Sequence, residues 1–215
     1  TISDVTLGRG FAVYMDSSLV LRNGTLTSVH QNAVYVFSHS MVDMDLVDIN
    51  ITDRSVRHYD VITVYNDSYA TTTRVTVNNS IEAAFSAYGK EGLGYPTVYI
   101  ASSTFSNNTY GVYLYLTGPV HIESTEIFNG QYGIISEQSP LVLVNSSISS
   151  TTQKALWNFV LSRDGELLSE VSAENNWWGD ATGPQHSTLN SGGLGALVSD
   201  GVDFEPWLTD DPFND

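Results

Sequence analysis

The residue types that could carry out chemistry come together in one stretch, Asp53-Arg-Ser-Val-Arg57-His-Tyr-Asp60. Arg57, His58 and Asp60 could transfer protons there, because basic and carboxylate side chains serve as general bases and acids. The stretch opens a long irregular segment, and loops on a rigid scaffold often hold sites. The alternative is a solvated loop with a local Arg–Asp pair, which contributes less than about 1 kcal/mol. We expect no catalytic residues and retain these three side chains as the weaker hypothesis.

Acidic side chains gather just upstream, at Asp43, Asp45 and Asp48. Asp43 and Asp45 are separated by one residue, so a strand would turn both toward the same side. Ca²⁺ binds roughly six to eight oxygen atoms, of which these carboxylates could supply part, but the spacing is not that of a calcium-binding loop. We therefore expect no metal or other cofactor, with Ca²⁺ at these aspartates as the alternative.

Asn-x-Ser/Thr sequons are frequent and would serve as glycosylation sites in a host that glycosylates. Asn23, Asn78 and Asn145 each precede an apolar residue by three positions, where Asn bonds turn backbone and tolerates left-handed geometry. Asn66 lies in the irregular segment and is the best glycan candidate. The six sequons are at Asn23, Asn50, Asn66, Asn78, Asn107 and Asn145.

The elements that must position these residues follow from a repeat in the stretch 98–135, where every landmark recurs at the same interval. A fixed period of roughly 20 residues indicates a solenoid whose coils stack to bury a common core. Weaker copies on either side predict an all-β, single-stranded parallel β-helix of roughly seven or eight coils, with about three short strands in each. The repeated landmarks are Val98 and Val120, Phe105 and Ile127, and Gly111 and Gly133.

One position of each coil carries a small residue, which lets the backbone turn tightly against its neighbours. The predicted members of this position are Ala12, Ala33, Gly111, Gly133 and Ala155.

A second position of each coil faces outward and is mostly aromatic. Coils stacked in register would align these side chains as an apolar stripe on the outside. The stripe could stabilise the sheet by cross-strand pairing, at about 0.2–1 kcal/mol per pair. It could instead form a contact surface, since contiguous exposed aromatic residues mark partners or sugars. The interface candidates are Tyr14, Tyr35, Tyr113, Ile135 and Trp157 in one shared position, with Tyr115 beside them.

Three phrases, Asn23-Gly-Thr-Leu26, Ser102-Ser-Thr-Phe105-Ser-Asn-Asn108 and Asn145-Ser-Ser-Ile148, look like the repeat Asn-Ser-x-Ile-x-x-Asn. The chain thereby resembles the right-handed parallel β-helix proteins, the pectate-lyase-like solenoids. The resemblance implies a fold and no single activity, because that fold hosts lyases, hydrolases, adhesins and structural proteins. The lyases' basic proton abstractor with clustered Ca²⁺ ligands does not transfer to this sequence, nor do the hydrolases' paired Asp and Gly-His-Gly motifs.

Residues 175–215 are similar to the closing segment of many bacterial and archaeal cell-surface β-helix proteins, through Asn175-Asn-Trp-Trp-Gly179 and Pro206-Trp-Leu208. An open β-helix end exposes apolar interior and unpaired strand edges. We therefore expect a β-helix over residues 1–174 and a capping segment over residues 175–215, with an aromatic ligand site as the alternative. The capping candidates are Trp177, Trp178, Phe204 and Trp207.

Composition restricts the partners and the location. Acidic residues outnumber basic ones 24 to 8 in the 215-residue chain, and the formal charge of −16 would repel nucleic acid and anionic membranes. No apolar run reaches the roughly 18 residues that a membrane-spanning helix needs. The chain has no cysteine, which favours export, and it begins at Thr1 as a processed form or a fragment would.

These observations together favour a non-enzymatic structural protein, extracellular or on a cell surface, such as a self-assembling subunit of a surface layer or filament. Its partners would be copies of itself, other surface proteins or polysaccharide. The alternative is a carbohydrate-active enzyme or a carbohydrate-binding module that uses the groove near Arg57, His58 and Asp60.

Overall fold

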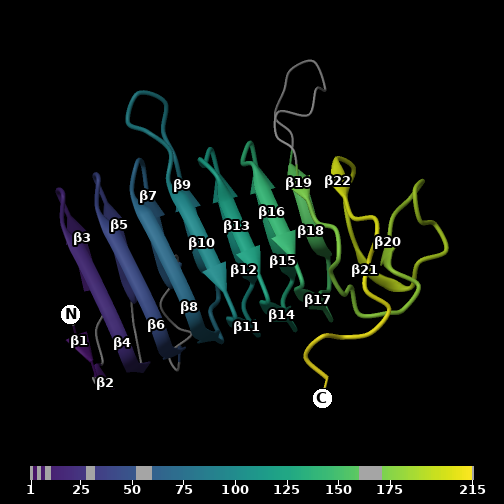
Figure 1. The fold of residues 1–215 in the computed structure, drawn as a ribbon, viewed down its shortest axis with the longest axis horizontal. Coiled ribbons are helices and arrows are strands. Elements are labelled where there is room, and N and C mark those ends of the chain that lie inside the picture. The colour runs from purple at the N-terminus through teal and green to yellow at the C-terminus, as the bar shows by residue number, and fades with distance from the viewer. Residues whose placement is uncertain are drawn as a thin grey trace.

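The computed structural model of the chain describes residues 2–3, 6–7, 11–27, 32–51, 60–159 and 171–214. The regular elements in these residues are β-strands, and they form two long parallel sheets that extend along the molecule (Figure 1). The predicted all-β parallel β-helix is confirmed. No helix in this part of the chain has the length and hydropathy that a membrane crossing requires.

Within the described residues, sheet A has 13 strands and sheet B has seven. The main path of sheet A runs through β1 (Ile2–Ser3), β4 (Ser18–Thr27), β6 (Met41–Asn50), β8 (Tyr69–Asn78), β10 (Thr97–Ala101), β13 (Val120–Glu123), β16 (Leu141–Val144), β19 (Val171–Ser172) and β22 (Val202–Asp203). Beside this path lie β2 (Thr6–Leu7), β11 (Thr104–Ser106), β14 (Glu126–Phe128) and β17 (Ser147–Ser149).

Sheet B is built from one strand of each coil that it crosses. Its strands are β3 (Phe11–Tyr14), β5 (Val34–Phe37), β7 (Ile62–Tyr65), β9 (Ala83–Tyr88), β12 (Tyr110–Tyr115), β15 (Tyr132–Glu137) and β18 (Lys154–Phe159). A small two-stranded sheet in the tail pairs β20 (Pro184–Gln185) with β21 (Gly195–Leu197).

Single residues in the left-handed backbone conformation bend each coil. In the ten-residue strands β4, β6 and β8 these residues are Asn23, Leu46 and Arg74, with φ of 51°, 57° and 53°. The parallel pairing of β4 with β6 continues on both sides of the bend. Two of the three predicted strands per coil are therefore one bent strand here, because a one-residue bend leaves the ladder intact. From Thr97 onward the two segments are separate strands, such as β10 and β11.

The step between successive coils varies more than the sequence predicts. Ser17 and Ser40 are 23 positions apart in adjacent coils, Ser40 and Ser68 are 28 apart, and Ser103 and Thr125 are 22 apart. The predicted equal spacing of the landmarks in the stretch 98–135 is confirmed by the strand pairing. The longer steps come from insertions in the loops, which leave the strands in register.

The strand pairing of the first coil shows that the predicted placement of Ala12 is wrong. Phe11 pairs with Val34, so Ala12 lies opposite Tyr35 and does not share the position of Ala33. The prediction treated Ala12 and Ala33 as equivalent positions of successive coils. The pairing of Phe11 with Val34 shows that the step from the first coil to the second is longer than predicted. The small position holds Ala33, Val61, Ala84, Gly111, Gly133 and Ala155, each of which precedes a paired core residue, so Val61 is an exception to the predicted small residue.

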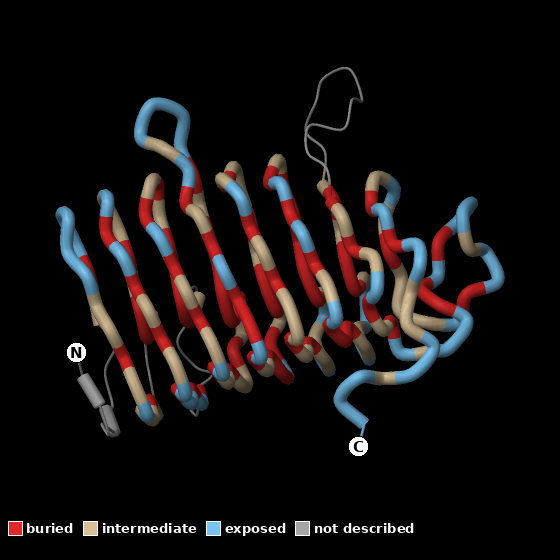
Figure 2. The backbone as a smooth tube through the Cα atoms, viewed as in Figure 1, coloured by how far each residue is buried: buried red, intermediate tan, exposed pale blue. Residues whose placement is uncertain are grey.

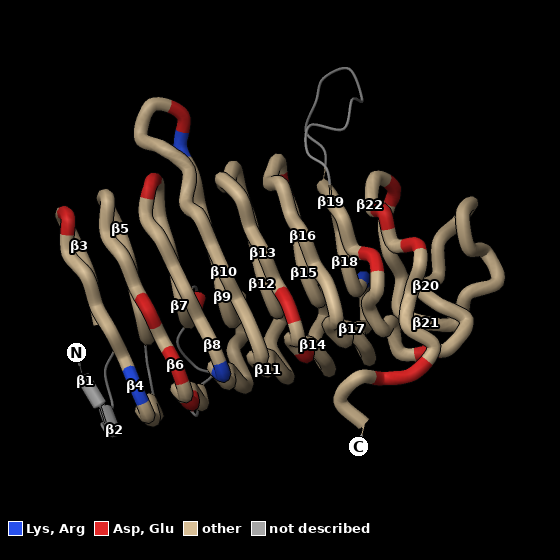
Figure 3. Tube along the Cα trace, in the orientation of Figure 1, with Lys and Arg blue, Asp and Glu red and all other residues tan. Residues whose placement is uncertain are grey.

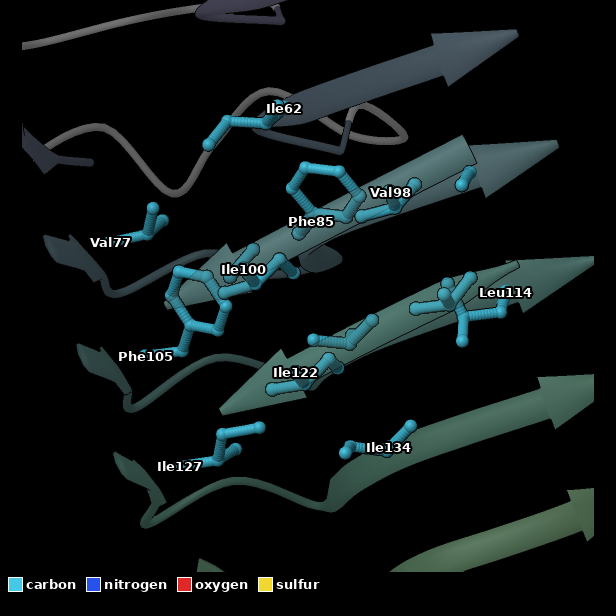
Figure 4. Packing of buried hydrophobic residues seen from close by; sticks show 14 of the residues in the cluster. Ile62, Val77, Phe85, Val98, Ile100, Phe105, Leu114, Ile122, Ile127 and Ile134 are labelled. Atoms are coloured by element: carbon cyan, nitrogen blue, oxygen red, sulfur yellow. The ribbon is translucent and has the colours of Figure 1, made fainter. Parts of the chain in front are cut away.

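Apolar side chains from both sheets fill the interior of the coil stack. Val112 and Leu114 of β12 are fully buried, while Tyr113 and Tyr115 beside them are half-buried on the outside, as the alternation predicts. Figure 4 shows the labelled core side chains converging from successive strands. Buried positions continue from coil to coil, whereas exposed residues concentrate in the loops (Figure 2). Each fully buried aliphatic or Phe side chain contributes roughly 1.5–3 kcal/mol, so stacking of the coils stabilises the fold.

Buried polar side chains form a series of hydrogen bonds that links successive coils at the bends. The backbone N–H of Ser103 donates to Thr125 Oγ1 at 3.4 Å, that of Thr125 to Ser146 Oγ at 3.1 Å, and that of Ser146 to Asn176 Oδ1 at 2.8 Å. The Asn176 amide in turn donates to the carbonyl of Leu143 at 2.8 Å. This series of hydrogen bonds satisfies backbone N–H donors that the bends would otherwise leave buried without a partner. Asn176 therefore extends it from the coils into the tail.

The tail continues the β-helix and shares its core. β22 pairs in parallel with β19, which adds a strand to sheet A. Trp178 and Phe204 are 0% and 1% exposed and belong to the same hydrophobic cluster as the coils. Trp207 packs against this cluster and Trp177 is half-buried at its edge. These placements give the four aromatic residues contacts at the end of the stack, and their capping role stays a prediction.

The close approach of adjacent coils predicts that Gly133→Ala destabilises the fold. A Cβ at Gly133 would lie 2.4 Å from the Ala155 carbonyl oxygen and 2.5 Å from Ile148 Cγ2. We expect the free energy of unfolding in urea to fall by about 1–3 kcal/mol, because neighbouring coils must separate locally. Gly192→Ala is the matched control, since a Cβ there meets nothing within 4 Å. Equal stability of the two variants would contradict the predicted tight packing at Gly133.

Candidate functional site: an aromatic ladder on sheet B

The outward side of sheet B carries two adjacent rows of aligned side chains. One row places Tyr113, Ile135 and Trp157 in register, as predicted, and extends through Ser86 and Thr63 to Tyr35. Tyr14 does not belong to this row. It pairs with Phe37 in the second row, because the step of the first coil is longer than predicted.

The second row contains aromatic residues that the sequence prediction missed. It runs from Tyr14 through Phe37 to Tyr65 and Tyr88, then to the predicted Tyr115, and on to Glu137 and Phe159. Pairing of β7 with β9 places Tyr65 against Tyr88 directly. Phe37, Tyr65 and Tyr88 lie in coils with longer steps, so a fixed period cannot align them. The residue type at the last outward position of each strand is the signal that could have found them.

Rings of the two rows, joined by Tyr110 and Tyr132 beside them, make a continuous series of contacts across sheet B, which we call the aromatic ladder. Tyr115 of the second row is not among these ring contacts. Neighbouring ring centroids lie 5.0–6.4 Å apart, within the range of favourable aromatic pairs. The ladder consists of Tyr14, Tyr35, Phe37, Tyr65, Tyr88, Tyr110, Tyr113, Tyr132, Trp157 and Phe159. Ile135, the aliphatic interface candidate, is only 5% exposed and contributes little accessible surface.

The rings of the ladder meet at several angles, and the stacked pairs are a minority of the contacts. Tyr65 and Tyr88 are 23° from parallel, Tyr110 and Tyr132 are 19°, and Tyr132 and Trp157 are 21°. The other pairs are tilted or edge-to-face, such as Tyr110 with Tyr113 at 71° and Trp157 with Phe159 at 86°. Aromatic residues are enriched at protein interfaces, so such a surface suits contact with another protein.

A polar network lies beneath the middle of the ladder. Thr63 and Ser86 are buried although their row faces outward, and the Asn32 amide donates to Thr63 Oγ1 at 2.6 Å. Ser86 Oγ donates to Thr63 Oγ1 at 3.3 Å. The Tyr88 hydroxyl donates to Asp60 Oδ2 at 2.8 Å. Burial of the Tyr88 ring raises the pKa of its phenol far above the ordinary value, and the Asp60 charge adds to this effect.

A second carboxylate is held in the same way further along the ladder. The Tyr113 hydroxyl donates to Glu137 Oε2 at 3.0 Å, and Glu137 is 8% exposed. Burial, followed by the Glu137 charge, raises the pKa of Tyr113. At the end of sheet B the Lys154 ammonium lies over the Trp157 ring, 5.1 Å from its centroid.

The strands beneath the ladder carry few charged residues in a strongly acidic chain, and burial, together with the nearby Glu82 and Asp60 charges, raises the pKa of Tyr110. Glu137 and Lys154 are the charged residues within the described strands of sheet B, and one is bonded to Tyr113 while the other lies over Trp157. The strands of sheet A carry acidic residues along β6 and again on β13, β14 and β22. Figure 3 shows these acidic positions along β6 and in the loops. Electrostatic repulsion between two copies would therefore be weaker between their ladders than between their sheet A faces.

The catalytic alternative is only partly visible in the structure. Arg57 and His58 lie outside the described residues. The Asp60 carboxylate is bound by the Tyr88 hydroxyl and by the Ala83 backbone N–H at 3.1 Å. Asp60 is thus tied into the layer beneath the ladder.

Two of the three aspartates of the proposed calcium site are already hydrogen-bonded to arginines. Asp43 and Asp45 do face the same side of β6, but Asp43 bonds Arg22, and Asp45 accepts two bonds from Arg74 at 2.7 and 2.8 Å. The Arg74 guanidinium lowers the pKa of the Asp45 carboxyl below its ordinary value. Asp48 lies beyond the bend and is exposed. Among the described residues, no group of three or more His, Cys, Asp or Glu side chains is arranged to hold a metal ion.

The sequons differ in accessibility. Asn66, the predicted best glycan candidate, is only 5% exposed and has a left-handed backbone conformation. Asn23, Asn107 and Asn145 also take left-handed conformations, as predicted, and are exposed. Asn78 does not share that geometry, since Val77 and not Ile81 aligns with the core residue Phe105. Asn50 is exposed and Asn78 half-buried.

Comparison with known proteins gives one match. Residues 9–178 match a family described as a right handed beta helix region. No curated protein and no solved structure matches the chain.

The Tyr88–Asp60 bond predicts a stability difference between two Tyr→Phe variants. Tyr88→Phe removes a hydrogen bond to a carboxylate and should lower the free energy of unfolding by about 1–2 kcal/mol. Tyr69→Phe, at a side chain 58% exposed on sheet A, should change it by less than about 0.5 kcal/mol. Denaturant unfolding measures both, and an unchanged Tyr88→Phe would show that the bond does not stabilise the fold.

The raised pKa values of the buried ladder tyrosines predict an alkaline transition. The folded state holds these protons more tightly than the unfolded state, so their stabilisation is complete below about pH 10, the unfolded value. It is lost as pH rises from there toward the folded pKa values. In an ultraviolet titration of phenolate, some of the 12 tyrosines should ionise only together with unfolding. A single titration near pH 10 with the fold intact would contradict this.

Proposed function

The chain belongs to the right-handed beta helix family, and on that premise we propose that it is a non-enzymatic extracellular structural protein that self-assembles through the aromatic ladder of sheet B. The observation that carries the proposal is the unbroken series of ten rings on a face with little charge. The rest of the chain is acidic, with a formal charge of −16.

The size of the ladder face sets the strength of the proposed contact. Seven strands at about 4.8 Å spacing span roughly 30 Å, and four to six residues per strand span roughly 13–20 Å. Two such faces would bury on the order of 1,000 Å² in total, at the lower limit of specific interfaces and below the range of stable dimers. The proposed contact is therefore weak for one pair, and many such contacts would act together in a layer or filament.

The non-enzymatic part of the proposal rests on the state of the candidate carboxylates. Asp43 and Asp45 are engaged by arginines, and Asp60 by Tyr88. Extracellular placement is supported by the absence of cysteine and by exposed sequons at Asn23, Asn107 and Asn145.

A charge placed within the ladder should weaken self-association. Sedimentation of the unmodified chain should show an average mass that rises with concentration, with a dissociation constant on the order of 0.1–1 mM. Tyr65→Asp should raise this constant at least tenfold, because it places a carboxylate in the apolar contact.

The matched control is Tyr69→Asp on the exposed side of sheet A, which adds the same charge and should leave association unchanged. Circular dichroism establishes that each variant is folded. Tyr14→Asp, at a ring 50% exposed, serves as a second ladder variant if Tyr65→Asp unfolds. A chain that stays monomeric at the highest concentrations, or equal effects of the Tyr69 and ladder variants, would refute the proposal.

A further inference from the structure

A pocket of about 620 Å³ lies away from sheet B's ladder rings, where the last coil meets the tail. One wall is the turn that follows β17, residues 149–153, and another is the tail segment 177–179. β21 and the chain end near Asp211 and Asn214 complete it. Its volume lies within the roughly 300–1,000 Å³ that small-molecule sites occupy.

The pocket wall combines hydrogen-bonding groups with an aromatic side chain. Hydroxyl groups come from Ser150 and Thr151, and carboxamides from Gln153 and Gln185. These groups both donate and accept, which suits a ligand rich in hydroxyl groups. The half-buried Trp177 also lines the pocket and joins none of the ring contacts described for the aromatic ladder. Its ring can therefore contact the apolar face of a ligand.

The charge of the wall restricts the ligand further. The residues that line the pocket include no Lys or Arg, and Asp211 is their charged member. Glu126 lies close enough for the Asp211 charge to raise its pKa, after the larger effect of burial. An anionic ligand would meet repulsion here with no cation to offset it.

Two buried polar atoms beside the pocket lack a hydrogen-bond partner within the described part of the chain. Trp178 is 0% exposed, and its indole Nε1–H has no acceptor. Thr151 Oγ1 is likewise without a partner. Both residues line the pocket. Unsatisfied polar atoms of this kind point to a ligand or water that completes them.

We propose that this pocket binds a neutral saccharide, one or two sugar residues in size, with hydroxyl groups on the polar wall and a sugar face against Trp177. The site is separate from the aromatic ladder, so binding here and assembly there can succeed or fail independently.

Calorimetric titration of the full chain tests the proposal with a panel of neutral disaccharides, namely cellobiose, maltose and N,N′-diacetylchitobiose, and with digalacturonate as the acidic counterpart. At least one neutral disaccharide should bind with a dissociation constant on the order of 1 mM or tighter. Digalacturonate should bind at least tenfold more weakly. The indole N–H resonances of Trp177 and Trp178 should shift on binding, and that of Trp157 should not.

Gln153→Ala and Gln185→Ala are the informative variants, because both side chains are exposed and line the pocket. Each should weaken binding by at least threefold. Gln131→Ala is the matched control: Gln131 is exposed in the preceding coil and accepts the backbone N–H of Gln153 at 2.9 Å through its own carbonyl. The proposal is overturned if no neutral disaccharide binds, if digalacturonate binds equally well, or if both pocket variants bind as the control does.

Discussion

Every part of this structure depends on parallel backbone pairing between successive coils. The pairing requires each coil to follow nearly the same path as its neighbour, at a spacing of about 4.8 Å. That requirement explains the left-handed residues at the bends and the small position at Gly111, Gly133 and Ala155, where adjacent backbones nearly touch. It also explains the buried polar side chains that accept backbone N–H groups at the bends from one coil to the next, a series that ends on Asn176.

The same register determines what the outside of the molecule presents. Because equivalent positions stack, aromatic side chains at the outward positions of sheet B become one continuous ladder. Tyr88 and Tyr113 bind Asp60 and Glu137 at its base, so that face combines rings with carboxylates that are already hydrogen-bonded. The remaining acidic residues of the described chain lie on sheet A, in the loops and in the tail, so the proposed contact between two copies would meet less repulsion at sheet B than at sheet A.

The sequence was sufficient for the fold class, because the twin coils of the stretch 98–135 have equal steps and alternate apolar residues. It failed where loop insertions changed the step. Ala12 and Tyr14 were placed one row away from their true positions, and Tyr65 and Tyr88 were missed for the same reason. Burial of Asn66 could not be predicted either, because its position in the irregular segment suggested an exposed side chain, whereas its backbone N–H is bonded to the Tyr88 carbonyl of the next coil.

Hydroxyl-radical footprinting at increasing protein concentration tests the central claim, that the aromatic ladder is the contact face between copies. Ladder residues Tyr35, Tyr65 and Tyr113 should become less reactive as concentration rises, while Tyr69 and Tyr99 on sheet A keep the same reactivity. Equal protection of both sheets, or protection of the sheet A tyrosines alone, would contradict the account.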